Sequence, residues 1–187
     1  MGSARHSGEG PLTVAEFEEL PEEGAFRIEL VRGRLVRSPR PASLHGRLVI
    51  RLGRLLDEYA EAGGHGVVLA DAGVILGRNP DTVRGPDLAF FSPERIPEDG
   101  YSTTFWGPPD LAIEIAWPSN RVAEMEAKVA DYLEAGVRRV WVVEPASRSV
   151  TLWLPTRQAR VLRRDDVLED VAVLPGFRLE LGTLFAL

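Results

Sequence analysis

The chain has 187 residues, of which 44% are hydrophobic and 27% are charged, and this balance is typical of one globular domain. It contains no cysteine, which excludes a disulfide framework, thiolate zinc sites and cysteine nucleophiles. Its 28 acidic and 22 basic residues give a formal net charge of −6, which argues against a protein that coats nucleic acid by bulk electrostatics but leaves room for a local site.

The N-terminal segment is small, polar and glycine-rich, so we expect residues 1–11 to form a flexible tail and residues 12–187 to form a single domain. The tail lacks the basic-then-apolar order of a signal peptide. No apolar run in the chain approaches the roughly 20 residues that a membrane span needs. We therefore expect a cytoplasmic protein that makes no membrane contact.

Capping signals, turn residues and hydrophobic periodicity predict the elements of the first half of the chain. They are, in chain order, a short helix from Thr13 to about Leu20, strands at 26–31 and 34–38 joined by a tight turn at Arg32-Gly33, and a helix from Ser43 to Tyr59 or beyond. The long helix carries its leucines on one stripe, which indicates that this face packs against a core.

The second half is rich in short aliphatic runs bounded by glycine, proline and asparagine, which are typical of core strands. Strands are expected at 66–70, 73–77, 87–91 and 110–117, then a helix from Ser119 or Asn120 to Gly136, then strands at 138–145, 149–155, 159–163 and 178–181. This order predicts a mixed α/β fold with one central mixed sheet flanked by two main helices.

Two acidic residues lie on predicted core strands. Asp87 opens the strand at 87–91, and Glu114 lies inside the strand at 110–117. Strand alternation places Glu114 between two alanines on one face, while leucine and isoleucine side chains occupy the other face. An ionised carboxylate in an otherwise apolar strand is costly unless a divalent cation or a lysine pairs with it.

The segments RGPDLAFFSPERIP and PPDLAIEIAWPSNRVAEMEAKVADYLEAGVRRVWVVEP, with the order of elements from about Glu16 to the C-terminus, resemble the Uma-two family of predicted endonucleases. The resemblance implies a restriction-endonuclease-like fold of the PD-(D/E)XK superfamily. It also implies that Asp87 and Glu114 hold Mg²⁺ or Mn²⁺ and that a lysine assists the attacking water. In the superfamily that lysine stands two residues beyond the second acid, where this chain has Ala116.

Uma-two proteins carry the lysine on the following helix instead, at the position of Lys128, and the resemblance implies the same role here. Lys128 is the single lysine of the chain, whose other 21 basic residues are arginines. Arginine is a broad planar fork and a poor substitute for a compact ammonium group. The alternative interpretation is an ordinary i,i+4 ion pair between Lys128 and Glu124 on a solvated helix face.

Structural roles also remain open for the two acids of the predicted metal site. Asp87 can merely cap a turn after Pro86, and Glu114 can be the partner in a buried structural ion pair. Binding of a divalent ion distinguishes these interpretations from a metal site.

Glu29 and His45 match two further family positions. The resemblance implies that Glu29 completes an oxygen-rich shell for a hard cation, but its alternation against apolar neighbours also suits a surface glutamate. His45 lies near the start of the long helix, close to its apolar stripe. It can be a catalytic histidine or a hydrogen-bonded histidine of the core.

Together these residues predict a metal-dependent nuclease, most simply a DNA endonuclease that hydrolyses phosphodiester bonds. Arg84 and Arg121 can contact backbone phosphates or can be plain surface charge. The alternative function is a catalytically silent restriction-endonuclease-like module that acts in homodimerisation or partner binding, which the acidic net charge favours. Its interface would draw on the tryptophans, namely Trp106, Trp117, Trp141 and Trp153, although Trp141 and Trp153 lie in predicted strands, where core packing is the more common use.

Overall fold

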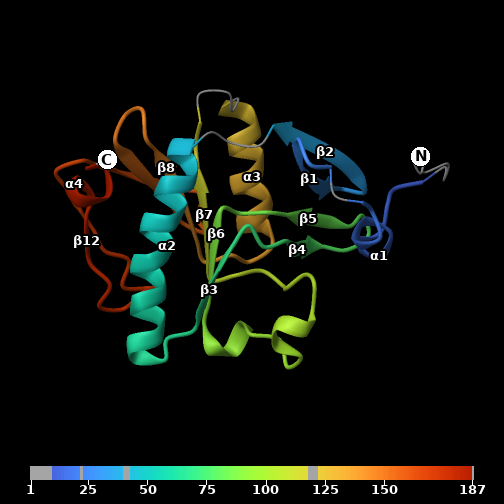
Figure 1. Cartoon of the computed structure of the whole chain (residues 1–187), viewed down its shortest axis with the longest axis horizontal. Helices are drawn as coiled ribbons and strands as arrows, with labels where there is room; N and C mark the ends of the chain where they lie inside the picture. Colours follow the sequence, from blue (N-terminus) through green and yellow to red (C-terminus); the bar gives the residue numbers. More distant parts are fainter. Residues whose placement is uncertain (1–9, 22, 40–42, 118–121, 187) are drawn as a thin grey trace.

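The computed structural model describes residues 10–21, 23–39, 43–117 and 122–186. Two long helices lie on opposite sides of a central sheet, and a second sheet extends to one side of it (Figure 1). Most of the predicted tail lies outside the described residues. From Leu12 onward the chain packs against the domain, because the Leu12 side chain is buried and its N–H donates to the Gly33 carbonyl over 2.8 Å.

The first half of the chain follows the predicted order of elements and adds one short strand. These elements are α1 (Val14–Glu18), β1 (Phe26–Val31), β2 (Arg34–Pro39), α2 (Ser43–Gly63), β3 (Val67–Ala70), β4 (Val74–Gly77), β5 (Thr82–Arg84) and β6 (Leu88–Phe91). The predicted capping box at the start of α1 is present, with reciprocal bonds between Thr13 and Glu16. Arg32 and Gly33 both adopt positive φ, which makes the tight turn between β1 and β2.

The second half likewise agrees with the predicted order and adds elements near the C-terminus. Two short 3₁₀ helices, η1 (Pro93–Arg95) and η2 (Gly100–Ser102), precede β7 (Leu111–Ile115), α3 (Val122–Glu134), β8 (Arg139–Glu144), β9 (Ser149–Trp153), β10 (Ala159–Arg163), β11 (Val167–Leu168), β12 (Leu179–Glu180) and α4 (Leu181–Leu184). The predicted start of α3 at Ser119 or Asn120 lies outside the described residues.

The central sheet has six strands in the order β10-β9-β8-β7-β6-β3. β7 and β8 run parallel, and the other neighbouring pairs run antiparallel, so the sheet is mixed as predicted. A parallel pair needs a crossover connection, and α3 supplies it between β7 and β8. β7, α3 and β8 therefore form one β-α-β unit, and β6 pairs with β7 beside it. This arrangement brings together the site residues on or next to β6, β7 and α3.

Two apolar cores cover the two faces of this sheet. Leucines of α2 pack with Leu111, Ile113 and Ile115 of β7 on one face, whereas α3 packs with Ala112 on the other. The predicted alternation along this strand is confirmed, and it places Glu114 on the α3 side of the sheet.

The prediction of one central sheet did not include a second sheet, of four strands in the order β2-β1-β5-β4. The strands of this sheet pack around a small core formed by Leu12, Val14, Leu30 and Val83. The second sheet forms because β5 pairs with β1 and β4 and does not continue into β6. Alternation reports that a strand is half-buried but not which strand it pairs with.

Trp106, proposed for an interface, is instead part of a core, and Trp141 packs in a core as its place in a strand predicted. Trp106 is 3% exposed and Trp141 is 0% exposed, so neither contributes to the surface. Within the described ranges, none of the helices has the length and apolar content that crossing a bilayer requires.

Candidate active site

Asp87 lies at the junction of α2, β1 and the central sheet. It directly precedes β6, and its side chain is buried. Its Oδ2 accepts the Ile115 backbone N–H over 2.7 Å and lies 2.9 Å from His45 Nε2 on α2, while its Oδ1 accepts Arg27 Nη1 over 2.5 Å. The hydrogen bond from His45 and the charge of Arg27 outweigh burial and hold the pKa of Asp87 below its ordinary value. An ionised Asp87 is acceptor-only, so His45 Nε2 carries the proton of their bond.

Glu114 lies beside Asp87 on the neighbouring strand. The antiparallel register pairs Leu88 with Ile113, so the residues before and after them, Asp87 and Glu114, are next to each other. The Glu114 carboxylate accepts the Lys128 ammonium over 3.2 Å and the Tyr132 hydroxyl over 2.7 Å. Both donors come from consecutive turns of α3, because residues four apart share a helix face.

Glu29 joins the cluster from β1. Its Oε1 lies 3.0 Å from the Lys128 ammonium and accepts the Gly85 backbone N–H over 3.0 Å, and its Oε2 accepts Arg84 Nη1 over 2.8 Å. Glu29 is 7% exposed, so it is a buried residue of this cluster and not a surface glutamate. Burial alone would raise its pKa, but the charges of Lys128 and Arg84 lower it, so Glu29 is ionised.

Lys128 therefore reaches into the cluster as predicted. Its ammonium lies between the carboxylates of Glu29 and Glu114, and its side chain is only 20% exposed. Burial alone would lower the pKa of Lys128, but Glu114 and Glu29 raise it above its ordinary value, so the amine is charged at neutral pH. The interpretation of Lys128 as a residue of a solvated helix face is wrong.

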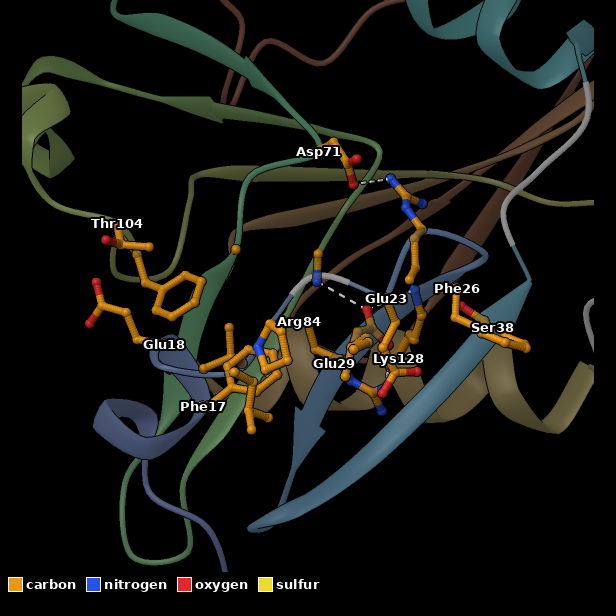
Figure 2. A pocket seen from close by; sticks show the side chains of 18 residues that line it. Phe17, Glu18, Glu23, Phe26, Glu29, Ser38, Asp71, Arg84, Thr104 and Lys128 are labelled. Atoms are coloured by element: carbon orange, nitrogen blue, oxygen red, sulfur yellow. Dashed lines mark hydrogen bonds and ion pairs between the residues drawn. The ribbon is translucent and has the colours of Figure 1, made fainter. Parts of the chain in front are cut away.

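An elongated cavity of about 340 Å³ leads to this cluster from the surface. Figure 2 shows Glu29, Arg84 and Lys128 in its middle, Phe17 and Glu18 of α1 on one side, and Phe26 and Ser38 on the other. Of the cluster, the cavity thus reaches Arg27, Glu29, Arg84 and Lys128, whereas neither Asp87 nor Glu114 is among the described residues that line it.

Comparisons with known proteins give the family of the chain. A family model described as "Uma2: Putative restriction endonuclease" matches residues 14–182. The chain belongs to the Uma2 family. The Uma2 resemblance that the sequence motifs indicate is therefore confirmed.

A solved structure shares the fold of this Uma2 chain. It is the crystal structure of a protein from Anabaena variabilis described as a putative nuclease belonging to DUF820. The two match with a TM-score of 0.83 and 22% sequence identity, over 94% of this chain and 98% of that one. The predicted restriction-endonuclease-like fold is thus confirmed. No curated protein matches the chain.

Two polar residues of the Uma2 site were not predicted, and a third has contacts that differ from those predicted. Arg27 bridges Asp87 and Asp71, and Tyr132 donates to Glu114. Arg84 was predicted to contact phosphate or to be surface charge, but its side chain is 7% exposed and is held by Glu29 and by Asp131 of α3. The i,i+4 spacing of Lys128 and Tyr132 could have indicated the tyrosine, whereas nothing in the sequence separates Arg27 from the many other arginines of the chain. Arg121 lies outside the described residues.

The donor chemistry of the Uma2 site fits a divalent cation. Asp87 and Glu114 are buried carboxylates at facing positions of neighbouring strands, and carboxylate oxygens are the ligands that Mg²⁺ and Mn²⁺ prefer. Within the described part of the chain, no three histidine, aspartate or glutamate side chains are arranged as a metal-ligand group. In this structure Arg27 is paired with the Asp87 carboxylate and Lys128 with the Glu114 carboxylate. A metal at Asp87 would therefore have to displace Arg27.

Glu114 is expected to make the stability of the metal-free protein depend on pH. Burial raises the pKa of Glu114 from its ordinary value of 4.5 to about 7, with Asp87 and Glu29 adding to the rise. Between these two values the unfolded chain releases the proton while the folded chain keeps it. The free energy of unfolding contributed by Glu114 is therefore greatest below pH 4.5 and is lost as the pH rises to about 7.

Glu114→Gln removes this titration and provides the comparison. We expect urea denaturation in the presence of chelator to show that wild type loses stability relative to Glu114→Gln between pH 5 and pH 8. Glu134→Gln is the matched control, because Glu134 is a glutamate at the end of α3 whose side chain is 53% exposed. If the free energies of unfolding of wild type and Glu114→Gln changed in parallel with pH, that result would contradict the raised pKa of Glu114.

Proposed function

We propose that this Uma2 protein is a metal-dependent nuclease that hydrolyses phosphodiester bonds, with DNA as its substrate. The observation that carries the proposal is the convergence of Glu114 and Glu29 on Lys128, with Asp87 beside Glu114. Buried charges of this kind are costly to assemble, and they cluster at sites of chemistry. The family description points to the same class of reaction.

Asp87 and Glu114 are the proposed ligands of a Mg²⁺ or Mn²⁺ ion. When bound, such an ion polarises the scissile phosphate and lowers the pKa of a bound water. His45 and the Ile115 N–H fix the Asp87 carboxylate from two sides, and Tyr132 and Lys128 fix Glu114. The two acids are therefore held in place before any metal arrives, and binding requires that the metal replace Arg27 at Asp87.

Lys128 is the proposed catalytic lysine. Because its pKa is raised, it remains a cation at neutral pH and is suited to stabilising negative charge on the phosphate oxygens or to orienting the attacking water, not to accepting a proton. Glu29 holds this ammonium at the open side of the site and is itself held by Arg84. Glu29 and His45 thus act on the reaction through Lys128 and Asp87.

Cleavage of plasmid and single-stranded DNA tests the proposal. We expect cleavage to require Mg²⁺ or Mn²⁺ and to stop when chelator is added. Calcium should support binding with little cleavage, because its looser coordination holds phosphate and water less strictly. Isothermal titration with Mn²⁺ should show binding to wild type that Asp87→Ala and Glu114→Ala both lose.

Asp57→Ala is the matched control for these acid substitutions, since Asp57 is an exposed acid of α2 outside the cluster. If Mn²⁺ binds to wild type but neither DNA nor RNA is cut, and the variants differ from wild type only in thermal stability, the nuclease proposal fails. The silent module that acts in homodimerisation or partner binding then becomes the better explanation of the fold.

A further inference from the structure

The cavity that leads to Lys128 differs in chemistry from one end to the other. Lys128 lies in its middle (Figure 2) and Arg27 also lines it, and each of these two side chains is 20% exposed. Arg27 pairs with Asp71 and Asp87, and Lys128 pairs with Glu29 and Glu114, so a phosphate bound here would take the place of the exposed Asp71 carboxylate at Arg27. Arg84 lies behind these two cations and is engaged with Glu29 and Asp131.

One end of the cavity is aromatic. Phe17 of α1 and Phe105 of the loop before β7 both line the cavity, with ring centroids 5.7 Å apart and ring planes at 20°. Gly73 lies against the Phe105 ring, and a Cβ there would come within 2.4 Å of it, so glycine allows this close approach of ring and backbone. Both rings are only partly buried, which leaves aromatic surface facing the cavity.

Acidic residues on the cavity wall are mostly neutralised. Glu23 accepts a two-pronged hydrogen bond from Arg37, and Asp71 is paired with Arg27. Glu18 is exposed and lies beside Phe17 at the aromatic end, away from Lys128 (Figure 2). A carboxylate there would repel a second phosphate but can accept hydrogen bonds from the amino groups of a nucleobase.

We propose that this cavity binds one unpaired nucleotide, with its phosphate at Arg27 and Lys128 and its base against Phe17 and Phe105. The volume of about 340 Å³ lies at the small end of ligand pockets and suits a single nucleotide rather than a base pair. Aromatic side chains stack on any base once it is free of its neighbours. The inference rests on the proposed function only in taking this phosphate as the scissile one.

The consequence is a preference for single-stranded nucleic acid, or for a base extruded from a duplex. A paired and stacked base cannot enter a cavity of this size without leaving the helix. The net charge of −6 supports this, because binding along a duplex depends on a broad basic surface, whereas one nucleotide needs only the local pair of cations.

Fluorescence anisotropy with a labelled 12-nucleotide DNA tests the proposal in calcium, where binding is measured apart from cleavage. We expect wild type to bind the single strand at least about tenfold more tightly than the blunt duplex of the same sequence. Phe105→Leu keeps an apolar side chain but removes the flat ring, so it should weaken single-strand binding by roughly 5- to 100-fold. Phe185→Leu is the control, because Phe185 is buried in the separate core against α2.

An abasic strand of the same length isolates the base contact. Wild type should bind the abasic strand as weakly as Phe105→Leu binds the normal strand. The affinity of Phe105→Leu should be nearly the same for the two strands, because removing the base and removing the ring abolish the same stacking contact. Equal affinity of wild type for single strand and duplex would overturn the proposal. So would an unchanged affinity of Phe105→Leu for the single strand, provided that its melting temperature shows it folded.

The two proposals fail separately. If Phe105→Leu cuts duplex DNA at the wild-type rate with Mn²⁺, the nuclease stands and the nucleotide site is wrong. If the single strand binds as expected and no DNA is cut under any metal, the nucleotide site stands and the nuclease is wrong.

Discussion

Lys128→Ala is expected to lower the rate of DNA cleavage by about 10²- to 10³-fold while leaving Mn²⁺ binding nearly unchanged. The ammonium lies 3.2 Å from Glu114 and 3.0 Å from Glu29, where a positive charge can act on the phosphate in the transition state. One such group acting mainly in the transition state is commonly worth this factor. Single-turnover cleavage and calorimetric titration with Mn²⁺ measure the two effects separately.

Lys128→Arg should recover little of the lost rate, because a planar guanidinium cannot take the place of a compact ammonium between two carboxylates. Glu126→Ala is the matched control, since Glu126 is an exposed residue of the same helix. A Lys128→Ala variant that binds Mn²⁺ and cuts DNA at the wild-type rate would remove the lysine from the mechanism.

Asp87→Ala is expected to lower the free energy of unfolding by about 3 kcal/mol in metal-free protein, besides abolishing Mn²⁺ binding. The substitution leaves Arg27, His45 and the Ile115 N–H without their buried acceptor. Removing one partner of a buried ion pair typically costs about 3–5 kcal/mol, and the lower end applies because Arg27 is 20% exposed and keeps Asp71. Urea denaturation in chelator measures the loss.

Asp71→Ala provides the control, because Asp71 contacts the same arginine from a site where its side chain is 58% exposed. An exposed ion pair contributes about 0–1 kcal/mol, so this variant should unfold nearly as wild type does. Equal losses for the two variants would mean that Arg27, and not the buried network of Asp87, determines the stability of this region.

Local patterns in the sequence were sufficient for much of the fold. The capping box of Thr13 and Glu16 and the turn at Arg32-Gly33 depend on neighbouring residues alone, so both were predictable. The alternation that placed Glu114 opposite the isoleucines of its strand is equally local. The leucine stripe of α2 predicted its buried face for the same reason.

The sequence by itself therefore determined the element order, the buried faces and, through the family motifs, the residues Asp87, Glu114 and Lys128 as candidates. Tertiary structure alone decided that Glu29 shares Lys128 with Glu114, that Arg27 holds Asp87, and that Arg84 is buried. It also decided that β5 pairs with β1, which separates the second sheet from the first. Side-chain periodicity reports only whether a residue faces a core. The partner of a charged side chain depends instead on strand pairing between segments far apart in the chain, and many small contact energies together determine that pairing.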